Sequence, residues 1–193
     1  MSYPLPPVND AVFHVLLEGS GSPSVRSSCS LVLDGDAVIV VDPGMAPSQA
    51  AILDPLRQLG VEPSDVTDVV ISHHHPDHTV NVGLFGEARV HDHWAIYHHD
   101  VWTSRPAHGF AVSPSVMLWE TPGHTPQDIT TVIGTADGMV ACTHLWWRAS
   151  GPVDDPLATD NDAIHRHRPE VQAVAKIIVP GHGPAFESGT GPQ

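Results

Sequence analysis

Short apolar runs bounded by turn residues dominate the hydrophobic pattern of this chain, and such runs predict β-strands. Asp34-Gly35-Asp36 separates two of the runs and Ala136-Asp137-Gly138 separates another two, so each pair is expected to form a hairpin. The predicted strands lie at residues 11–17, 29–33, 37–41, 69–71, 88–90, 116–120, 129–133, 139–142 and 177–179.

Two longer segments, residues 47–59 and 160–176, have the pattern expected of helices. In the first, Ser48 is a candidate cap, Gly60 a stop signal, and Pro55 is expected to kink or split the helix.

Residues 91–110 form the least regular part of the pattern. Five histidines and two tryptophans fall in this stretch. We expect a helix on which histidines such as His91 and His93 are solvated, with Trp94, Tyr97 and Trp102 in the core or an interface rather than at a substrate.

The length and the net charge of the chain limit which kinds of molecule it is expected to bind. A chain of 193 residues predicts one domain, residues 1–193. Eight basic against 22 acidic residues give a formal charge of −14, which repels nucleic acids and anionic membranes. A small-molecule substrate is therefore expected, and a homo-oligomer remains open.

Features of the sequence that report on the compartment favour a cytoplasmic location. Two cysteines, Cys29 and Cys142, cannot form a disulfide framework. The first ten residues do not resemble a signal peptide, and no apolar run approaches the roughly 18 residues of a transmembrane helix.

The stretch Ser72–Thr79 (SHHHPDHT) carries the chemistry. It directly follows the apolar run at 69–71, and Pro76 keeps the loop extended until a helix can start near Asp77, with Asp77 or Thr79 as its cap and residues 81–85 continuing it. In an extended loop His73 and His75 point to one side and His74 to the other, so His74 is expected not to be a ligand.

Asp77 and His78 face the same pocket from a second angle. Neutral imidazoles and carboxylates are ligands that suit Zn²⁺ or Fe²⁺. The pairs His73/His75 and Asp77/His78 therefore predict two adjacent metal sites.

His73-x-His75-x-Asp77-His78 resembles the HxHxDH signature of the metallo-β-lactamase superfamily. Further matches, in the order of that family, are Val41-Asp42-Pro43-Gly44, Thr121-Pro122-Gly123-His124-Thr125 and Pro180-Gly181-His182-Gly183. The resemblance implies an α/β (α+β) fold, a four-layer αββα sandwich with a core from about residue 11 to about 187, in a small single-domain branch.

The resemblance also implies which residues bind metal. His73, His75 and His124 match the first site, Asp77, His78 and His182 match the second, and Asp42 supports the loop. The family usually has a bridging Asp where this chain has His144, and an imidazole cannot bridge two ions as a carboxylate does. The second site is therefore expected to be weaker, to be rearranged towards His144, or to be empty. Cys142 could add a thiolate, but a buried structural cysteine is favoured.

The implied function is a metal-dependent hydrolase that uses a metal-bound hydroxide on a small ester, thioester or lactone. One or two Zn²⁺ ions are expected, with iron or manganese possible. Asp77 would accept and donate protons, and His144 would be a ligand, a general acid or an oxyanion donor. The alternatives are a phosphodiesterase or nuclease of the same superfamily, and a mononuclear or degenerate metal-binding variant, for example an iron-dependent redox protein.

Overall fold

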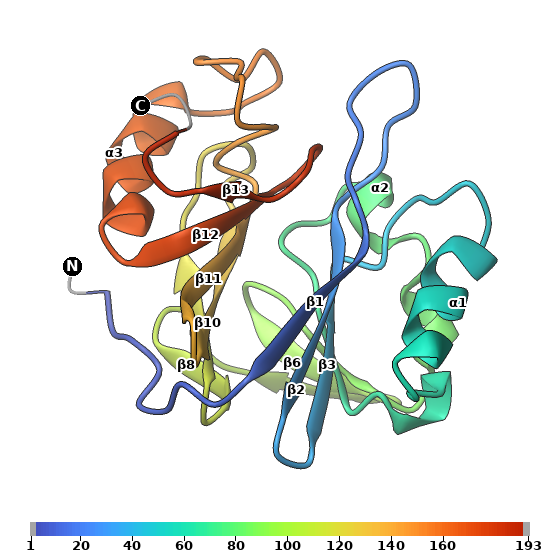
Figure 1. Cartoon of the computed structure of the whole chain (residues 1–193). Coiled ribbons are helices and arrows are strands. Elements are labelled where there is room, and N and C mark those ends of the chain that lie inside the picture. The colour runs from blue at the N-terminus through green and yellow to red at the C-terminus, as the bar shows by residue number, and fades with distance from the viewer. Residues whose placement is uncertain (1–2, 191–193) are drawn as a thin grey trace.

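The computed structural model describes residues 3–190. Two mixed β-sheets pack face to face, with helix α1 on the outer side of one sheet and helix α3 on the outer side of the other (Figure 1). This α–β–β–α order confirms the predicted α/β sandwich.

The first sheet has seven strands in the order β1 to β7. Its central pairs β3/β4 and β4/β5 are parallel and the remaining pairs are antiparallel. Its strands are Val12–Leu17 (β1), Cys29–Asp34 (β2), Ala37–Val41 (β3), Asp68–Val70 (β4), Arg89–His91 (β5), Ala95–His98 (β6) and Val101–Ser104 (β7).

The second sheet has six strands in the order β13-β12-β11-β10-β9-β8, and only β11/β12 is a parallel pair. Both predicted hairpins, β2/β3 and β10/β11, are confirmed. The strands of this sheet are Phe110–Ser113 (β8), Val116–Glu120 (β9), Ile129–Thr135 (β10), Gly138–Thr143 (β11), Ala175–Pro180 (β12) and Phe186–Glu187 (β13).

The two predicted long helices exist but differ in detail. Helix α1 covers Ala50–Gln58 without being divided at Pro55, and its N-cap position is Gln49 with no side-chain cap, so the Ser48 cap was wrong. Helix α3 covers Asn161–Gln172, and the Asp160 carboxylate caps it by accepting from the Ala163 amide at 2.8 Å. It ends earlier than predicted because the last residues of that segment already belong to β12.

The helix after the His-rich loop is shorter than expected. Helix α2 covers Pro76–Thr79, and the predicted continuation is a separate 3₁₀ turn, Val82–Phe85 (η2). It starts at Pro76, with His75 at the N-cap, rather than at Asp77, because the fixed φ of proline suits the first helical position. A second 3₁₀ turn, Pro63–Asp65 (η1), precedes β4.

Buried apolar side chains form three clusters that match the layers. One lies between the sheets around Val32, Ile39 and Leu118. Another joins the first sheet to Ile52 of α1, and the third joins the second sheet to Ile164 of α3. Each layer is thus held by burial of its apolar face.

The expected helix in residues 91–110 was wrong. The segment forms the end of β5 and the antiparallel pair β6/β7, with Trp94 and Trp102 43% and 61% exposed rather than in the core. His91 is buried, not solvated, and its Nε2 lies 2.7 Å from a carboxylate oxygen of Asp68.

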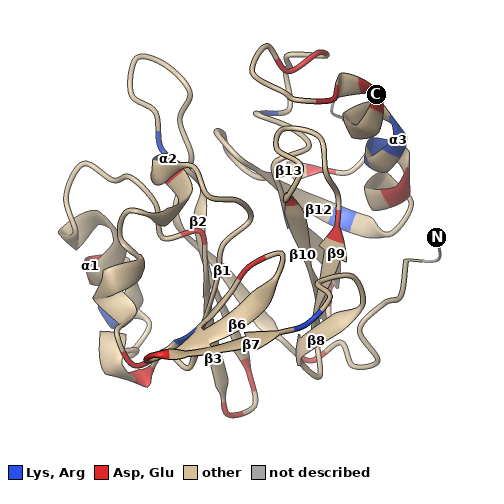
Figure 2. Cartoon of the chain, turned by 180° about the vertical axis from the view of Figure 1, so that it is seen from behind, with Lys and Arg blue, Asp and Glu red and all other residues tan. Residues whose placement is uncertain are grey.

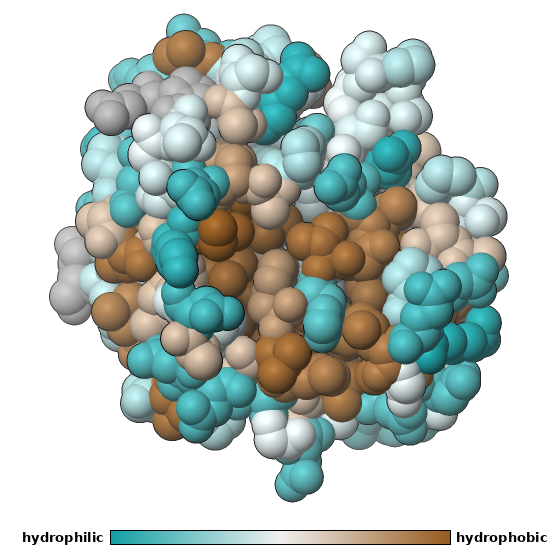
Figure 3. Space-filling view, in the orientation of Figure 1, coloured by the Kyte–Doolittle hydropathy of each residue, from teal (hydrophilic) through white to brown (hydrophobic). Residues whose placement is uncertain are grey.

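One side of the molecule, where the edges of the two sheets meet the solvent, carries an apolar patch. Figure 3 shows hydrophobic residues gathered in the middle of this view, over the region where β1 approaches β12 in Figure 1. A groove of about 490 Å³ runs there between Val12 and Phe13 on one side and Val140 and Ile177 on the other.

Candidate metal centre

Four loops meet at one end of the two sheets, and each follows a strand. The His-rich loop follows β4, the loop of His124 follows β9, His144 follows β11, and the loop of His182 follows β12. Because the strands are fixed by the buried layers, the loops bring distant parts of the sequence to one place.

His73, His75 and His124 form the first group, and their candidate ligand atoms lie within 4.8 Å of one another. His75 Nδ1 is 3.0 Å from His73 Nε2 and 3.0 Å from His124 Nε2. Ligand nitrogens at tetrahedral Zn²⁺ lie about 3.3 Å apart, given Zn–N bonds of about 2.0–2.1 Å. The spacing and the chemistry of this group therefore fit one metal ion.

Asp77, His78 and His182 form the second group, again within 4.8 Å. An Asp77 carboxylate oxygen is 3.6 Å from both His78 Nε2 and His182 Nε2. His78 Nε2 is buried and has no hydrogen-bond partner among the described residues. A buried imidazole nitrogen without a partner is costly unless it binds something, so this group also fits a metal ion.

The second ring nitrogen of four histidines is held from outside the two groups. Such contacts fix ring orientation and tautomer in metal sites. The contacts are His73 Nδ1 to Ser72 Oγ at 3.1 Å, His78 Nδ1 to Asp42 Oδ2 at 2.8 Å, His124 Nδ1 to Asp155 Oδ2 at 2.7 Å, and His182 Nδ1 to the Arg26 carbonyl at 3.0 Å.

Asp42 has the supporting place that the sequence predicted for it. Its carboxylate accepts from the Ser72 amide at 2.6 Å and from the Ser72 hydroxyl at 2.7 Å, besides contacting His78. The backbone of Asp42 has φ of 49°, an unusual value for a residue with a side chain. The neighbouring Gly44 is required because a Cβ there would collide with the Asp77 backbone.

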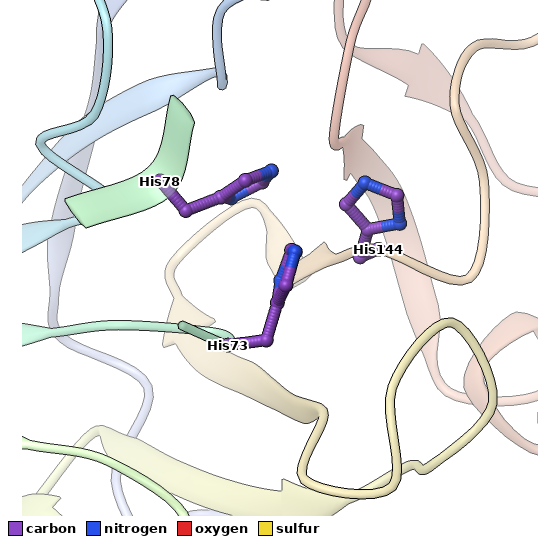
Figure 4. A group of neighbouring side chains, drawn as sticks. All are labelled: His73, His78 and His144. Atoms are coloured by element: carbon purple, nitrogen blue, oxygen red, sulfur yellow. The ribbon is translucent and has the colours of Figure 1, made fainter. Parts of the chain in front are cut away.

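His144 lies between the two groups. Figure 4 shows His73, His78 and His144 pointing towards one another from three separate elements, and their candidate ligand atoms lie within 4.8 Å. His144 Nε2 is 3.1 Å from His182 Nε2, and its ring stacks on that of His124 at 4.0 Å. A Cβ at Gly181 would lie only 2.6 Å from the His144 ring, so the glycine makes room for it.

Burial favours the neutral form of four of the imidazoles at this centre. Burial and the neighbouring histidines lower the pKa of His73 and of His144 well below the usual value, and burial also lowers the pKa of His75 and His182. Neutral imidazoles are the form that binds metal, so burial of these four side chains favours metal binding.

A cavity of about 130 Å³ opens onto both groups. Its floor carries ligand candidates and its walls include the apolar side chains of Val25, Trp147 and Leu157. None of the described lining residues is Lys or Arg. The lining consists of Gly21, Val25, His75, Asp77, His124, Trp147, Leu157 and His182.

The structure brings together every residue that the sequence nominated for the two sites. His74 points away from them, as predicted, and its Nε2 lies 3.1 Å from a carboxylate oxygen of Asp92. Cys142 is buried in the core, and burial raises the pKa of its thiol to about 12, so it is a neutral structural residue.

Sequence reasoning missed Asp155, which is 3% exposed and contacts His124. It stands in an Asp- and Pro-containing segment, Val153-Asp154-Asp155-Pro156, and no spacing in that segment distinguishes it from a solvated turn residue.

The fold and this cluster define a class: an α/β sandwich with a histidine-rich centre at the loop end of its sheets. A comparison with known families then identifies the chain. The profile of the Metallo-beta-lactamase superfamily matches residues 23–186, and the chain belongs to that superfamily. It is accordingly an enzyme of the hydrolase type.

Relatives with similar sequences include metallo-beta-lactamase domain-containing protein 1 of Xenopus laevis, 32% identical over 191 residues, and of Homo sapiens, 37% identical over 159 residues. The frog alignment covers 90% of this chain and 80% of the relative, whereas the human alignment covers 77% and 59%. The chain therefore spans little more than half of the human relative.

Similar solved structures support the fold. A candidate metallo-β-lactamase from Thermotoga maritima has a TM-score of 0.75 at 19% identity, covering 92% of this chain and 99% of its own. An N-acyl homoserine lactone hydrolase with product at its catalytic metal centre has a TM-score of 0.65 at 20% identity, covering 91% and 93%. A protein in a di-iron-bound form has a TM-score of 0.66 at 19% identity, covering 90% and 96%.

The helices of the structure can be compared with the length and polarity that a membrane-spanning helix requires. Within residues 3–190, every helix is too short or too polar to cross a bilayer.

Proposed function

We propose that this hydrolase cleaves a small, uncharged ester, thioester or lactone at the cavity over the two groups. The observation that carries the proposal is the lining of that cavity: imidazoles and Asp77 at the floor, apolar walls, and no basic side chain among the described lining residues. A neutral carbonyl substrate is compatible with such walls, whereas a phosphodiester would find no cationic partner among the described lining residues other than the metal ions themselves.

Two further observations favour a small neutral substrate. The formal charge of −14 disfavours polyanions, and Figure 2 shows Lys and Arg dispersed over several separate elements. The structural neighbour that hydrolyses an N-acyl homoserine lactone indicates that a sandwich of this shape can host lactone cleavage.

The residues have separate roles in this proposal. His73, His75 and His124 would hold a first ion, and Asp77, His78 and His182 a second. When bound, such an ion lowers the pKa of its water towards 7 and so supplies a nucleophile at neutral pH. Asp77 faces the cavity, where its carboxylate can orient water and accept its proton.

His144 is better suited to a ligand or packing role than to acid catalysis. It is 2% exposed and does not line the cavity, so a substrate in the cavity would not touch it. We propose zinc as the metal, with iron or manganese as alternatives, because imidazole and carboxylate ligands accept all three and a similar fold holds two irons.

A substrate panel tests the proposal. The metal-loaded protein is assayed with neutral lactones, thioesters and esters, and in parallel with a phosphodiester and a short RNA. We expect turnover of at least one carbonyl substrate, and loss of that turnover in His75→Ala but not in His74→Ala, a matched control from the same loop. Turnover of the phosphodiester or RNA alone would reject the proposal in favour of the nuclease alternative.

A further inference from the structure

The first group consists of three imidazoles and contains no carboxylate. Asp155 brings a negative charge into direct contact with it, because its Oδ2 is 2.7 Å from His124 Nδ1. The Asp155 side chain is 2% exposed. By contrast, the second group contains Asp77 and is also backed by Asp42 behind His78.

The carboxylate, the backbone N–H and the carbonyl of Asp155 are each hydrogen-bonded to neighbouring residues. Its second carboxylate oxygen accepts from the Leu157 amide at 2.8 Å. Its backbone N–H donates to Asn161 Oδ1 at 2.8 Å, and its carbonyl accepts from Asn161 Nδ2 at 3.0 Å. The carboxylate therefore presents one particular oxygen to His124 and has little freedom to swing away.

The Arg168 side chain of α3 is hydrogen-bonded to the backbone of residues 145–155, the segment that carries Asp155. Arg168 is 1% exposed, and arginine is almost never fully buried unless its guanidinium is paired or hydrogen-bonded. Its Nε donates to the Leu145 carbonyl at 2.9 Å and its Nη1 to the Val153 carbonyl at 2.6 Å, with Nη2 3.4 Å from the Pro152 carbonyl. The guanidinium of Arg168 thus connects the two ends of residues 145–155: Leu145 directly follows His144, and Val153 lies two residues before Asp155.

We infer that Asp155 sets the metal affinity of the first group and that Arg168 is a positioning residue that acts through Asp155. A carboxylate on the outer nitrogen fixes the tautomer of His124, so that Nε2 faces His73 and His75, and it raises the basicity of that ligand. It also supplies negative charge to an ion otherwise held by three neutral groups. The inference rests on the proposed function, because it concerns the same centre, but its test does not require activity.

The first experiment compares two neighbouring aspartates. Metal-free Asp155→Asn and Asp154→Asn are titrated with Co²⁺, followed by absorption, and with Zn²⁺ in competition with a chelator. Asp154 is the matched control because its side chain is 71% exposed. The Asp155→Asn change retains an oxygen for the Leu157 amide, removes the charge, and places an N–H donor instead of an acceptor opposite His124 Nδ1. We expect affinity for the first ion to fall about 10- to 100-fold for Asp155→Asn only.

The second experiment separates positioning from general stability. Arg168→Lys is compared with Arg166→Lys, whose side chain is 65% exposed on the same helix. We expect weaker metal binding only for Arg168→Lys, and no additional weakening when Arg168→Lys is combined with Asp155→Asn. A role limited to structural support would give additive losses instead. If Arg168→Lys does not fold, Arg168→Gln takes its place in the same cycle.

The outcomes distinguish the inference from the proposed function. Wild-type metal affinity in folded Asp155→Asn would overturn the role of Asp155, whatever substrate is cleaved. Additive losses in the double variant would overturn the role of Arg168. Weakened metal binding in a protein that cleaves no carbonyl substrate would support the inference while the proposed function fails.

Discussion

Each of the three histidines of the first group supplies one candidate ligand nitrogen. His73, His75 and His124 place three nitrogens within reach of one ion, and removing two of them leaves that group with a single ligand. We expect His73→Ala/His75→Ala to abolish metal binding at the first group and hydrolysis with it. Metal content by mass spectrometry checks this, with His74→Ala as control, and stoichiometric metal in the double variant would refute the assignment.

His144 is the residue at which this chain departs from the pattern of the family it resembles. Without a bridging carboxylate, two dications about 3.5–4 Å apart repel each other more strongly, so the second group should be only partly filled. We expect His144→Asp to raise occupancy of the second group, measured as metal per chain. Unchanged occupancy with lower turnover would instead indicate a catalytic role, and no change in either quantity would indicate packing.

At the residue scale, the sequence predicted the ligand candidates well because they lie in short motifs at fixed spacings. Asp155 and Arg168 could not be predicted in this way, since only tertiary packing brings Asp155 to His124 and brings Arg168 to the Val153 carbonyl. Their surroundings in the sequence are those of ordinary surface residues.

At the scale of elements, the strand-rich order was predictable from short apolar runs. Residues 91–110 were not, because polar and aromatic residues alternate weakly there, β7 is exposed along its whole length, and only one residue of β6 is buried. Long-range contacts position only the strand that precedes it: His91 and Arg89 of β5 both contact Asp68 on the adjacent strand β4.

That contact gives a prediction about acid stability. Burial alone would raise the pKa of Asp68, but hydrogen bonds from His91, Arg89 and Thr67 outweigh it and lower the pKa to about 2. The ionised carboxylate therefore contributes stability above its unfolded pKa of about 3.9, and this contribution is lost as the pH falls towards 2.

We expect Asp68→Asn to lower the free energy of unfolding by about 2 kcal/mol at pH 7, and by less at pH 3. Urea unfolding at both pH values measures this, with the exposed Asp54→Asn as control. An equal loss at both pH values would show that the pKa of Asp68 is not depressed in the folded chain.

At the scale of the whole molecule, the buried histidines couple folding to pH. Their lowered pKa means that the unfolded chain binds more protons than the folded one below about pH 6.5. The stability of the metal-free protein is therefore full above that pH and declines below it, by up to about 1.4 kcal/mol per pH unit for each such imidazole.

Thermal unfolding of metal-free protein at pH 7.5 and 5.5 checks this, and we expect a lower midpoint at pH 5.5. Since protons compete with metal for the same nitrogens, bound metal should also be released below about pH 6. Full metal occupancy at pH 4.5 would count against a centre built mainly from histidines.

The sandwich and its superfamily were predictable because four motifs occur in the right order along the chain, and each lies in a loop after a strand. A single domain over residues 1–193 stays a prediction, as does a cytoplasmic location. The substrate was not predictable, since the cavity walls come from loops around Val25, Trp147 and Leu157 that carry no motif.

Anomalous X-ray diffraction from crystals of protein purified without added metal, recorded at the absorption edges of zinc, iron and manganese, would show which metal the protein binds and at which residues. We predict a strong peak within bonding distance of His73 Nε2, His75 Nδ1 and His124 Nε2, and a weaker peak at Asp77, His78 and His182. No peak at the first group, or two peaks of equal full occupancy with His144 uncoordinated, would contradict it.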